Sequence, residues 1–129
     1  MLRAPGESDA ERAAAAKAIV AREFGWTRVE AASEREFYAR DAQGRLLWVK
    51  ARSGRYPNTS WDWRGANPQY DLLVGIIVAI DGEITTVFQA PRATVERLKH
   101  VNQDSSRLRW NDETKAAVAY LWGHRAGGG

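Results

Sequence analysis

The chain has 129 residues, 44% of them hydrophobic and 27% charged, values typical of one folded domain rather than a disordered chain. It contains no cysteine, which excludes disulfide bonds and metal sites built on thiolates. The formal net charge of +3 and the isoelectric point of about 9.5 permit nucleic-acid binding without requiring it. The longest apolar run, residues 72–80, is too short to cross a bilayer, and the first residues have no apolar signal core. We therefore expect a cytoplasmic protein that does not enter membranes.

We expect a single domain over residues 1–129, with an ordered core from about 8 to 123. The first predicted element is a helix over about residues 9–24. Ser8-Asp9-Ala10-Glu11 has the form of a capping box, in which the Ser8 hydroxyl accepts from a free helix N–H group. Ala13, Ala16, Val20 and Phe24 then recur at helical spacing, and Gly25 suits the position after the helix.

Three strands are predicted next. Residues 26–30 form a short strand, and residues 34–40 and 45–51 form a hairpin joined by residues 41–44. In the second hairpin strand, Lys50 lies on the same face as Trp48 because side chains alternate along a strand.

Residues 53–69 are rich in glycine, proline and asparagine, which predicts a long loop with a short extended piece at residues 61–63. Residues 70–80 are nearly all apolar or β-branched, as in a strand buried on both faces. Asp81-Gly82 predicts a tight hairpin turn, and residues 83–89 return as the partner strand.

The last third of the chain predicts a short helix with Pro91 at its first position, an edge strand over residues 106–110, and a final helix. Asn111 caps that final helix, which is expected to run to about Trp122. The expected fold is therefore α/β (α+β), with a single mixed sheet flanked by helices.

The segment from Gly44 to Arg52, followed by the apolar run that starts at Asp71, resembles the core of the PD-(D/E)XK nuclease superfamily. The resemblance covers about residues 10–84 and implies a restriction-endonuclease-like fold. In that family the second hairpin strand carries an acid, one further residue and then a lysine. Here Lys50 matches the lysine, but Trp48 stands at the acid position. The resemblance thus implies a nuclease-like domain with a degenerate active site.

Phosphodiester cleavage in such an enzyme needs Mg²⁺, which prefers carboxylate oxygens as ligands. Counting back across the hairpin turn places Tyr38 near the position where the first strand should supply an aspartate. Glu36, two residues further along the same face, is a candidate carboxylate if the hairpin carries a bulge. Asp41 is the other nearby acid. If the chain is a Mg²⁺-dependent nuclease, we expect Lys50, Glu36 and Asp41 to carry the catalysis. A single displaced carboxylate is a poor metal site, so we assign no metal ligand and favour a domain without catalytic activity.

Basic and aromatic residues gather around the long loop. Arginine and lysine suit phosphate, while tryptophan and tyrosine offer faces on which unpaired bases stack. The predicted nucleic-acid-binding residues are Lys50, Arg52, Arg55, Tyr56, Trp61, Trp63 and Arg64, with Arg107 and Arg109 extending the surface.

Several of these residues can also be explained by a purely structural role. Trp61 and Trp63 also suit side chains that pin the loop to the core, and Lys50 suits a strand lysine whose stem passes Trp48 on its way to water. Arg107 and Arg109 also suit a charged edge strand.

The expected function is therefore binding of DNA or RNA by a nuclease-like domain. A protein-interaction or regulatory module is a further alternative, with the edge strand near residues 107–110 and the tryptophan loop as its interface. His100 and His124 have no metal-ligand spacing, and no phosphate-binding glycine loop or serine-nucleophile motif is present in the sequence.

Overall fold

The computed structural model describes residues 2–30, 36–54, 59–65 and 68–123. The described helices are α1 (Asp9–Glu23), α2 (Arg92–Leu98) and α3 (Asp112–Ala117). The described strands are β1 (Thr27–Val29), β2 (Tyr38–Arg40), β3 (Leu46–Ser53), β4 (Ser60–Arg64), β5 (Leu72–Val78), β6 (Ile84–Pro91), β7 (His100–Asn102), β8 (Ser105–Arg109) and β9 (Ala119–Gly123).

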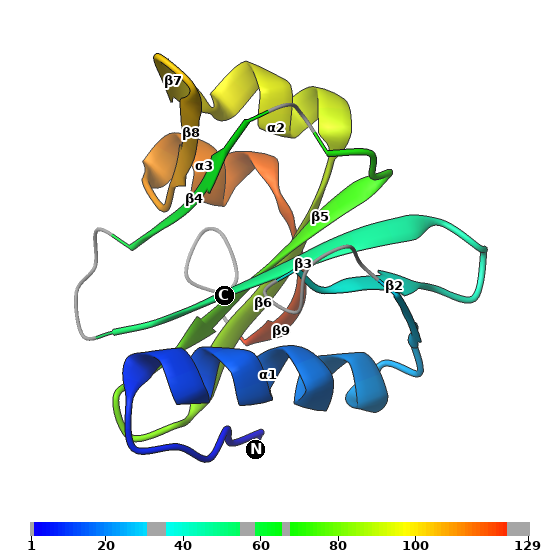
Figure 1. The fold of residues 1–129 in the computed structure, drawn as a ribbon, viewed down its shortest axis with the longest axis vertical. Coiled ribbons are helices and arrows are strands. Elements are labelled where there is room, and N and C mark those ends of the chain that lie inside the picture. The colour runs from blue at the N-terminus through cyan, green and yellow to red at the C-terminus, as the bar shows by residue number, and fades with distance from the viewer. Residues whose placement is uncertain (1, 31–35, 55–58, 66–67, 124–129) are drawn as a thin grey trace.

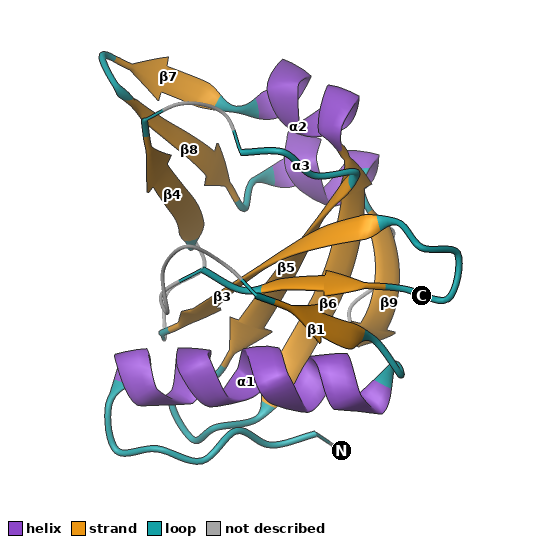
Figure 2. Ribbon diagram, turned by 45° about the vertical axis from the view of Figure 1, so that its right-hand side comes forward, coloured by secondary structure: helices purple, strands orange, loops and turns teal. Residues whose placement is uncertain are grey.

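The protein is an α+β protein with two sheets. A mixed sheet of six strands has the order β1-β2-β3-β5-β6-β9, and a second sheet of three strands has the order β4-β8-β7. Helix α1 covers one face of the six-stranded sheet, while the second sheet, α2 and α3 lie on the opposite side (Figures 1 and 2). The expectation of one sheet is therefore wrong, although a mixed sheet flanked by helices is confirmed.

Helix α1 begins as its capping box predicts. The Ser8 side chain accepts from the backbone N–H of Glu11 at 3.1 Å, and its hydroxyl donates to the Glu11 carboxylate at 3.1 Å. Ala16, Val20 and Ala21 are buried along the helix face that packs against β3 and β5. These small side chains allow the helix to approach the sheet closely.

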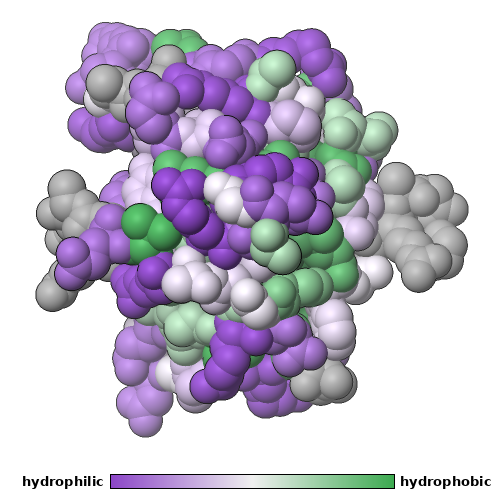
Figure 3. All heavy atoms as spheres, turned by 90° about the vertical axis from the view of Figure 1, so that its right-hand side faces the viewer, coloured by the Kyte–Doolittle hydropathy of each residue, from purple (hydrophilic) through white to green (hydrophobic). Residues whose placement is uncertain are grey.

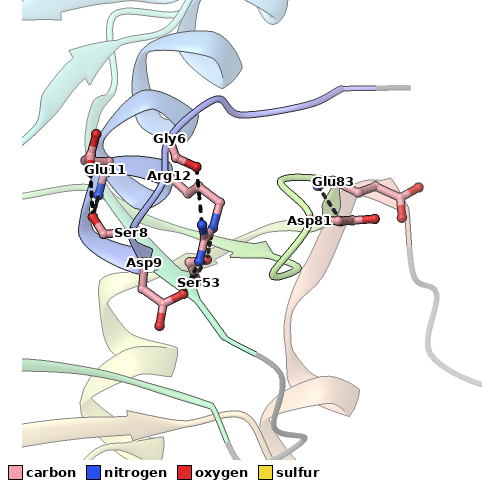
Figure 4. A network of polar contacts seen from close by, with 8 residues as sticks. All are labelled: Gly6, Ser8, Asp9, Glu11, Arg12, Ser53, Asp81 and Glu83. Atoms are coloured by element: carbon pink, nitrogen blue, oxygen red, sulfur yellow. Dashed lines mark hydrogen bonds and ion pairs between the residues drawn. The ribbon is translucent and has the colours of Figure 1, made fainter.

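A polar network fastens the start of α1 to the end of β3 (Figure 4). The Arg12 guanidinium pairs with Asp9 and donates through Nε to the Ser53 hydroxyl at 3.1 Å, and that hydroxyl donates to Asp9 at 3.2 Å. Ser53 is buried although it is polar, and the network provides its hydrogen bonds. Residues on β3 are thereby held in a fixed position relative to α1.

Strands β3 and β5 form the parallel centre of the six-stranded sheet, with Leu47 opposite Leu72 and Ser53 opposite Val78. Asp71 fixes this register, because its carboxylate accepts from the Leu46 backbone N–H at 2.7 Å. The prediction of a buried strand within residues 70–80 is confirmed by β5, and the hairpin to β6 follows at Gly82, whose φ is 94°.

The second sheet occupies chain segments that were expected to be a loop and an edge strand. Strand β4 is longer than the predicted extended piece and pairs antiparallel with β8. Strand β8 pairs with both β4 and β7, so it is the central strand and the expectation of an edge strand is wrong. The side chains of Trp61, Trp63 and Leu108 pack inward, against the face of the central sheet that carries Trp48 and Phe88.

The predicted last helix is correct only in its first half. Asn111 caps α3 by accepting from the Thr114 backbone N–H at 3.0 Å, but the helix ends at Ala117. Residues 119–123 form β9, which pairs antiparallel with β6. Tyr120 and Trp122 favour strands, and pairing with β6 outweighs the helical pattern that continues from α3. None of the helices in the described ranges combines the length and apolar character needed to cross a bilayer.

Candidate nucleic-acid interface

Three of the predicted phosphate-binding arginines lie together on the outer face of the second sheet. Side chains alternate along β4, so Trp61 and Trp63 are buried while Arg64 is exposed on the other side. Arg64 pairs with Ser105 of β8, which places Arg107 and Arg109 on the same side as Arg64. Both are exposed. We call Arg64, Arg107 and Arg109 the arginine face.

One carboxylate lies among these arginines. Asp62 of β4 stands opposite Arg107 of β8, and its Oδ1 accepts from the Arg107 Nε at 2.9 Å and from the Ser60 hydroxyl at 3.3 Å. Both partners of the ion pair are about half exposed, so the pair contributes little to stability. Its effect is electrostatic, because it neutralises one of the three arginine charges.

The two tryptophans expected to stack on bases are core side chains. Trp61 is 2% exposed and meets Phe88 and Trp110 edge-on, with ring centroids 5.1 and 5.8 Å apart. Trp63 is 8% exposed and meets Trp48 edge-on at 5.2 Å. Neither ring offers an open face, so the stacking role is corrected and the plainer interpretation, that they pin the segment to the core, holds.

Lys50 lines a small hollow where α1, β3 and β4 approach one another. The hollow has a volume of about 160 Å³. We call it the Lys50 hollow. The charged side chains that line it are Lys17, Glu36, Lys50, Arg52 and Asp62.

The Lys50 ammonium lies in an unusual electrostatic setting. Its Nζ lies 4.6 Å from the centre of the Trp48 ring, a cation–π arrangement. Burial lowers the pKa of Lys50, the nearby Glu36 carboxylate opposes this shift, and Lys17 adds to it. In the described parts of the chain, the Lys50 and Arg52 side chains form no ion pair or hydrogen bond with protein, so both charges are open to an anionic partner.

The carboxylate of Glu36 is held by the residue that replaces the expected acid. Trp48 Nε1 donates to Glu36 Oε2 at 2.7 Å. The hairpin register places Tyr38 opposite Trp48. Glu36 and Lys50 therefore lie at the same hollow, as the nuclease hypothesis expects, but an indole N–H occupies one oxygen of the carboxylate.

Asp41 is not brought to this hollow. It lies in the turn between β2 and β3, where its carboxylate accepts from the backbone N–H groups of Gln43 and Arg45 and from the Arg45 guanidinium. Burial alone would raise the pKa of Asp41, but these hydrogen bonds and the Arg45 charge outweigh it and lower the pKa. The turn lies on the side of the molecule that faces the viewer in Figure 3, and hydrophilic residues cover much of that surface. Asp41 therefore stabilises the turn.

The donor set does not fit the Mg²⁺ site that the resemblance implies. Of the two carboxylates at the Lys50 hollow, Glu36 accepts from Trp48 and Asp62 from Arg107 and Ser60. Across the described residues, no group of three or more aspartate, glutamate, histidine or cysteine side chains could hold a metal ion. We therefore derive no metal-dependent step for these residues.

Some site residues escaped the sequence analysis, and some lie outside the structure as described. Arg55 and Tyr56 fall in the undescribed range 55–58. Asp62 and Lys17 were not expected at the site. Asp62 had a usable signal, because a polar residue between two apolar ones marks the outer face of a strand, whereas Lys17 is one of many polar residues of α1.

Comparison with models of known protein families finds no match for this chain. A search of curated protein sequences finds no relative.

Proposed function

We propose that this protein binds nucleic acid through the phosphate backbone, as a nuclease-like domain without catalytic activity. The observation that supports the proposal is the arginine face. Arg64 and the pair Arg107 and Arg109 come from strands about forty residues apart in sequence, yet they project from one side of one sheet. Guanidinium groups bind phosphate oxygens in pairs of hydrogen bonds, which makes such a face suited to a polyanion.

The basic surface continues from this face to β3. The hollow beside Arg107 and Arg109 shares Ser60 with the Lys50 hollow, and Arg52 lines the latter. A backbone lying over β4 would therefore meet the arginine face first and Lys50 and Arg52 next. Because Trp61 and Trp63 are buried, phosphates rather than stacked bases supply the affinity, and we expect little sequence preference.

The restriction-endonuclease-like fold is part of the same proposal. The order of α1, the β2–β3 hairpin and the strand β5 parallel to β3 agrees with the resemblance. The connection from β3 to β5 runs through β4 and the second sheet, which the resemblance did not predict.

The Mg²⁺-dependent nuclease stays the second candidate, because Glu36 and Lys50 line the same hollow. The occupied carboxylates argue against it. Incubating the protein with DNA and RNA and Mg²⁺ or Mn²⁺ separates the two functions. Cleavage that is lost in Lys50→Ala would establish the nuclease, whereas substrate that stays intact with either metal counts against it.

The protein-interaction module loses the feature on which it was based. Strand β8 is paired on both sides, and Trp110 beside it is 8% exposed, so neither offers a free edge or an exposed ring. We therefore place the DNA or RNA proposal first.

Fluorescence anisotropy with a labelled DNA duplex and the corresponding single strand tests binding. Affinity should fall as salt rises, with a log–log slope of roughly −3 when the arginine face alone contacts duplex phosphates and a steeper slope when Lys50 and Arg52 contribute. Arg109→Gln should weaken binding and reduce the slope by about one. Arg22→Gln, which removes an equal charge from the exposed last turn of α1, is the matched control and should leave both values unchanged. Binding that is absent or insensitive to salt contradicts the proposal.

A further inference from the structure

A hollow of about 400 Å³ lies at the end of the arginine face, beside the β7–β8 hairpin. Its lining includes the whole arginine face together with His100 and Asn102 of β7 and Ser105 of β8. Strands β7 and β8 lie at the end of the molecule farthest from α1 (Figure 2). The volume is within the range of small-ligand sites and is large enough for one nucleotide.

The charge around this hollow exceeds what one backbone phosphate needs. Three arginines and one aspartate line it, which gives a formal net charge of +2 with His100 neutral. Asp62 is already paired with Arg107, so it repels an anion less than an open carboxylate would. A phosphodiester carries one negative charge, whereas a phosphomonoester carries about −1.5 to −2 near pH 7 and has three free acceptor oxygens.

The neutral donors and the position of the hollow favour the same ligand. The Asn102 amide and the Ser105 hydroxyl add hydrogen-bonding groups beside the guanidinium groups. The hollow shares Arg107 and Arg109 with the next hollow along the sheet, and Asp62 with the Lys50 hollow. It therefore lies at one end of the basic surface, where a bound strand would end.

We propose that this hollow, the β7–β8 hollow, binds the terminal phosphomonoester of a polynucleotide. The following nucleotides then run over β4 toward Lys50. The proposal rests on the proposed function, because it makes the protein a reader of phosphorylated strand ends. Bidentate hydrogen bonds from the arginines hold the terminal phosphate, and the His100 imidazole lines the same hollow.

The test compares short single-stranded DNA oligonucleotides that differ only in a 5′-phosphate, a 3′-phosphate or hydroxyl ends, by anisotropy with the full chain. One phosphorylated end should bind about tenfold more tightly than the hydroxyl-ended strand, because a near-dianion replaces a neutral end. Arg64→Gln and His100→Asn should reduce this preference, and Arg22→Gln should leave it intact. Equal binding of all three strands, or a preference unaffected by Arg64→Gln, overturns the proposal.

The two proposals, nucleic-acid binding and recognition of a phosphorylated strand end, can fail separately. Binding of hydroxyl-ended strands without any end preference retains the proposed function and removes the β7–β8 hollow as an end-binding site. If no oligonucleotide binds, the proposed function is wrong. Titration with adenosine 5′-monophosphate and with inorganic phosphate, followed by NMR, then tests whether the β7–β8 hollow binds a phosphomonoester at all. Shifts confined to β7, β8 and Arg64 support a phosphomonoester site, and no shift there overturns it.

Discussion

The indole nitrogen of Trp48 donates a hydrogen bond to the carboxylate of Glu36 over 2.7 Å. Trp48 stands at the position where the proposed resemblance would place an acid, and its indole N–H occupies one oxygen of the nearby Glu36 carboxylate. The same ring lies under the Lys50 ammonium. One side chain thus contacts both the Glu36 carboxylate and the Lys50 ammonium of the Lys50 hollow.

Replacing Glu36 should destabilise the protein through Trp48. Trp48 is 1% exposed, so Glu36→Ala leaves its indole N–H without the carboxylate partner. We expect a loss of about 1–3 kcal/mol in the free energy of unfolding, measured by urea denaturation. Glu36→Gln keeps an acceptor oxygen and should lose less. An equal loss in both variants would contradict a hydrogen-bond origin.

Removing the Asp62 charge should strengthen nucleic-acid binding. Asp62→Asn frees the Arg107 charge on the arginine face, and we expect affinity for a DNA duplex to rise about three- to tenfold at low salt. The gain should shrink at high salt, because screening weakens the interactions of exposed charges. Thermal denaturation should change little, since the ion pair is half exposed. Glu23→Gln removes an equal charge from α1 and should leave binding unchanged.

Stability at alkaline pH should depend on Tyr70. Burial and the nearby Glu96 carboxylate raise the pKa of Tyr70 from 10.0 to about 12 in the folded protein. Between these values the unfolded chain loses the phenolic proton while the folded chain keeps it, so stability falls as pH rises. Relative to Tyr70→Phe, the wild type should lose about 1 kcal/mol by about pH 11. The unfolding free energies of both proteins are measured by urea denaturation at several pH values. If the two free energies fall in parallel as the pH rises, Tyr70 is not the cause of the loss.

Strand β5 should not tolerate a side chain at Gly75. A Cβ at this position would overlap the Phe88 ring, and Phe88 is stacked on Trp110 with ring centroids 4.8 Å apart. The ring has little room to move, so Gly75→Ala should cost about 3 kcal/mol or more in unfolding free energy.

The matched control for Gly75→Ala is Gly54→Ala. A Cβ on Gly54 meets nothing within 4 Å, and this glycine does not have a positive φ. Urea denaturation of the two variants measures the difference. A Gly75→Ala protein as stable as Gly54→Ala would mean that the Phe88 packing is looser than the structure shows.

Local patterns predicted the elements whose evidence lies within a few residues. The capping box at Ser8 and the apolar run before Asp81 were sufficient to place α1 and β5. Strand β4 was only partly predicted, because its partner β8 lies about 45 residues later and its pairing leaves no local signal. Strand β9 was mistaken for helix, since residues 118–122 satisfy both patterns until β6 is known to lie beside them.

The sequence could name residue types for a candidate site, but it could not give their arrangement. The sequence analysis named Arg64 beside the long loop and Arg107 and Arg109 as an extension of that surface. Only the β4–β8 register shows that the three arginines share a face. Two tryptophans separated by one residue satisfy a base-stacking surface and a buried strand face equally well. Burial against Phe88 and Trp48, which the sequence cannot reveal, decided between them.

The long-range pairing of β4 with β8 has a consequence for how the molecule is made. Residues 60–64 leave the ribosome well before residues 105–109, so the arginines of the proposed interface cannot assemble until most of the polypeptide has emerged. A nascent or shortened chain that ends before β8 therefore carries Arg64 but lacks the surface to which Arg64 belongs. Under the proposed function, affinity for nucleic acid is acquired late, and only by chains in which β4 has paired with β8.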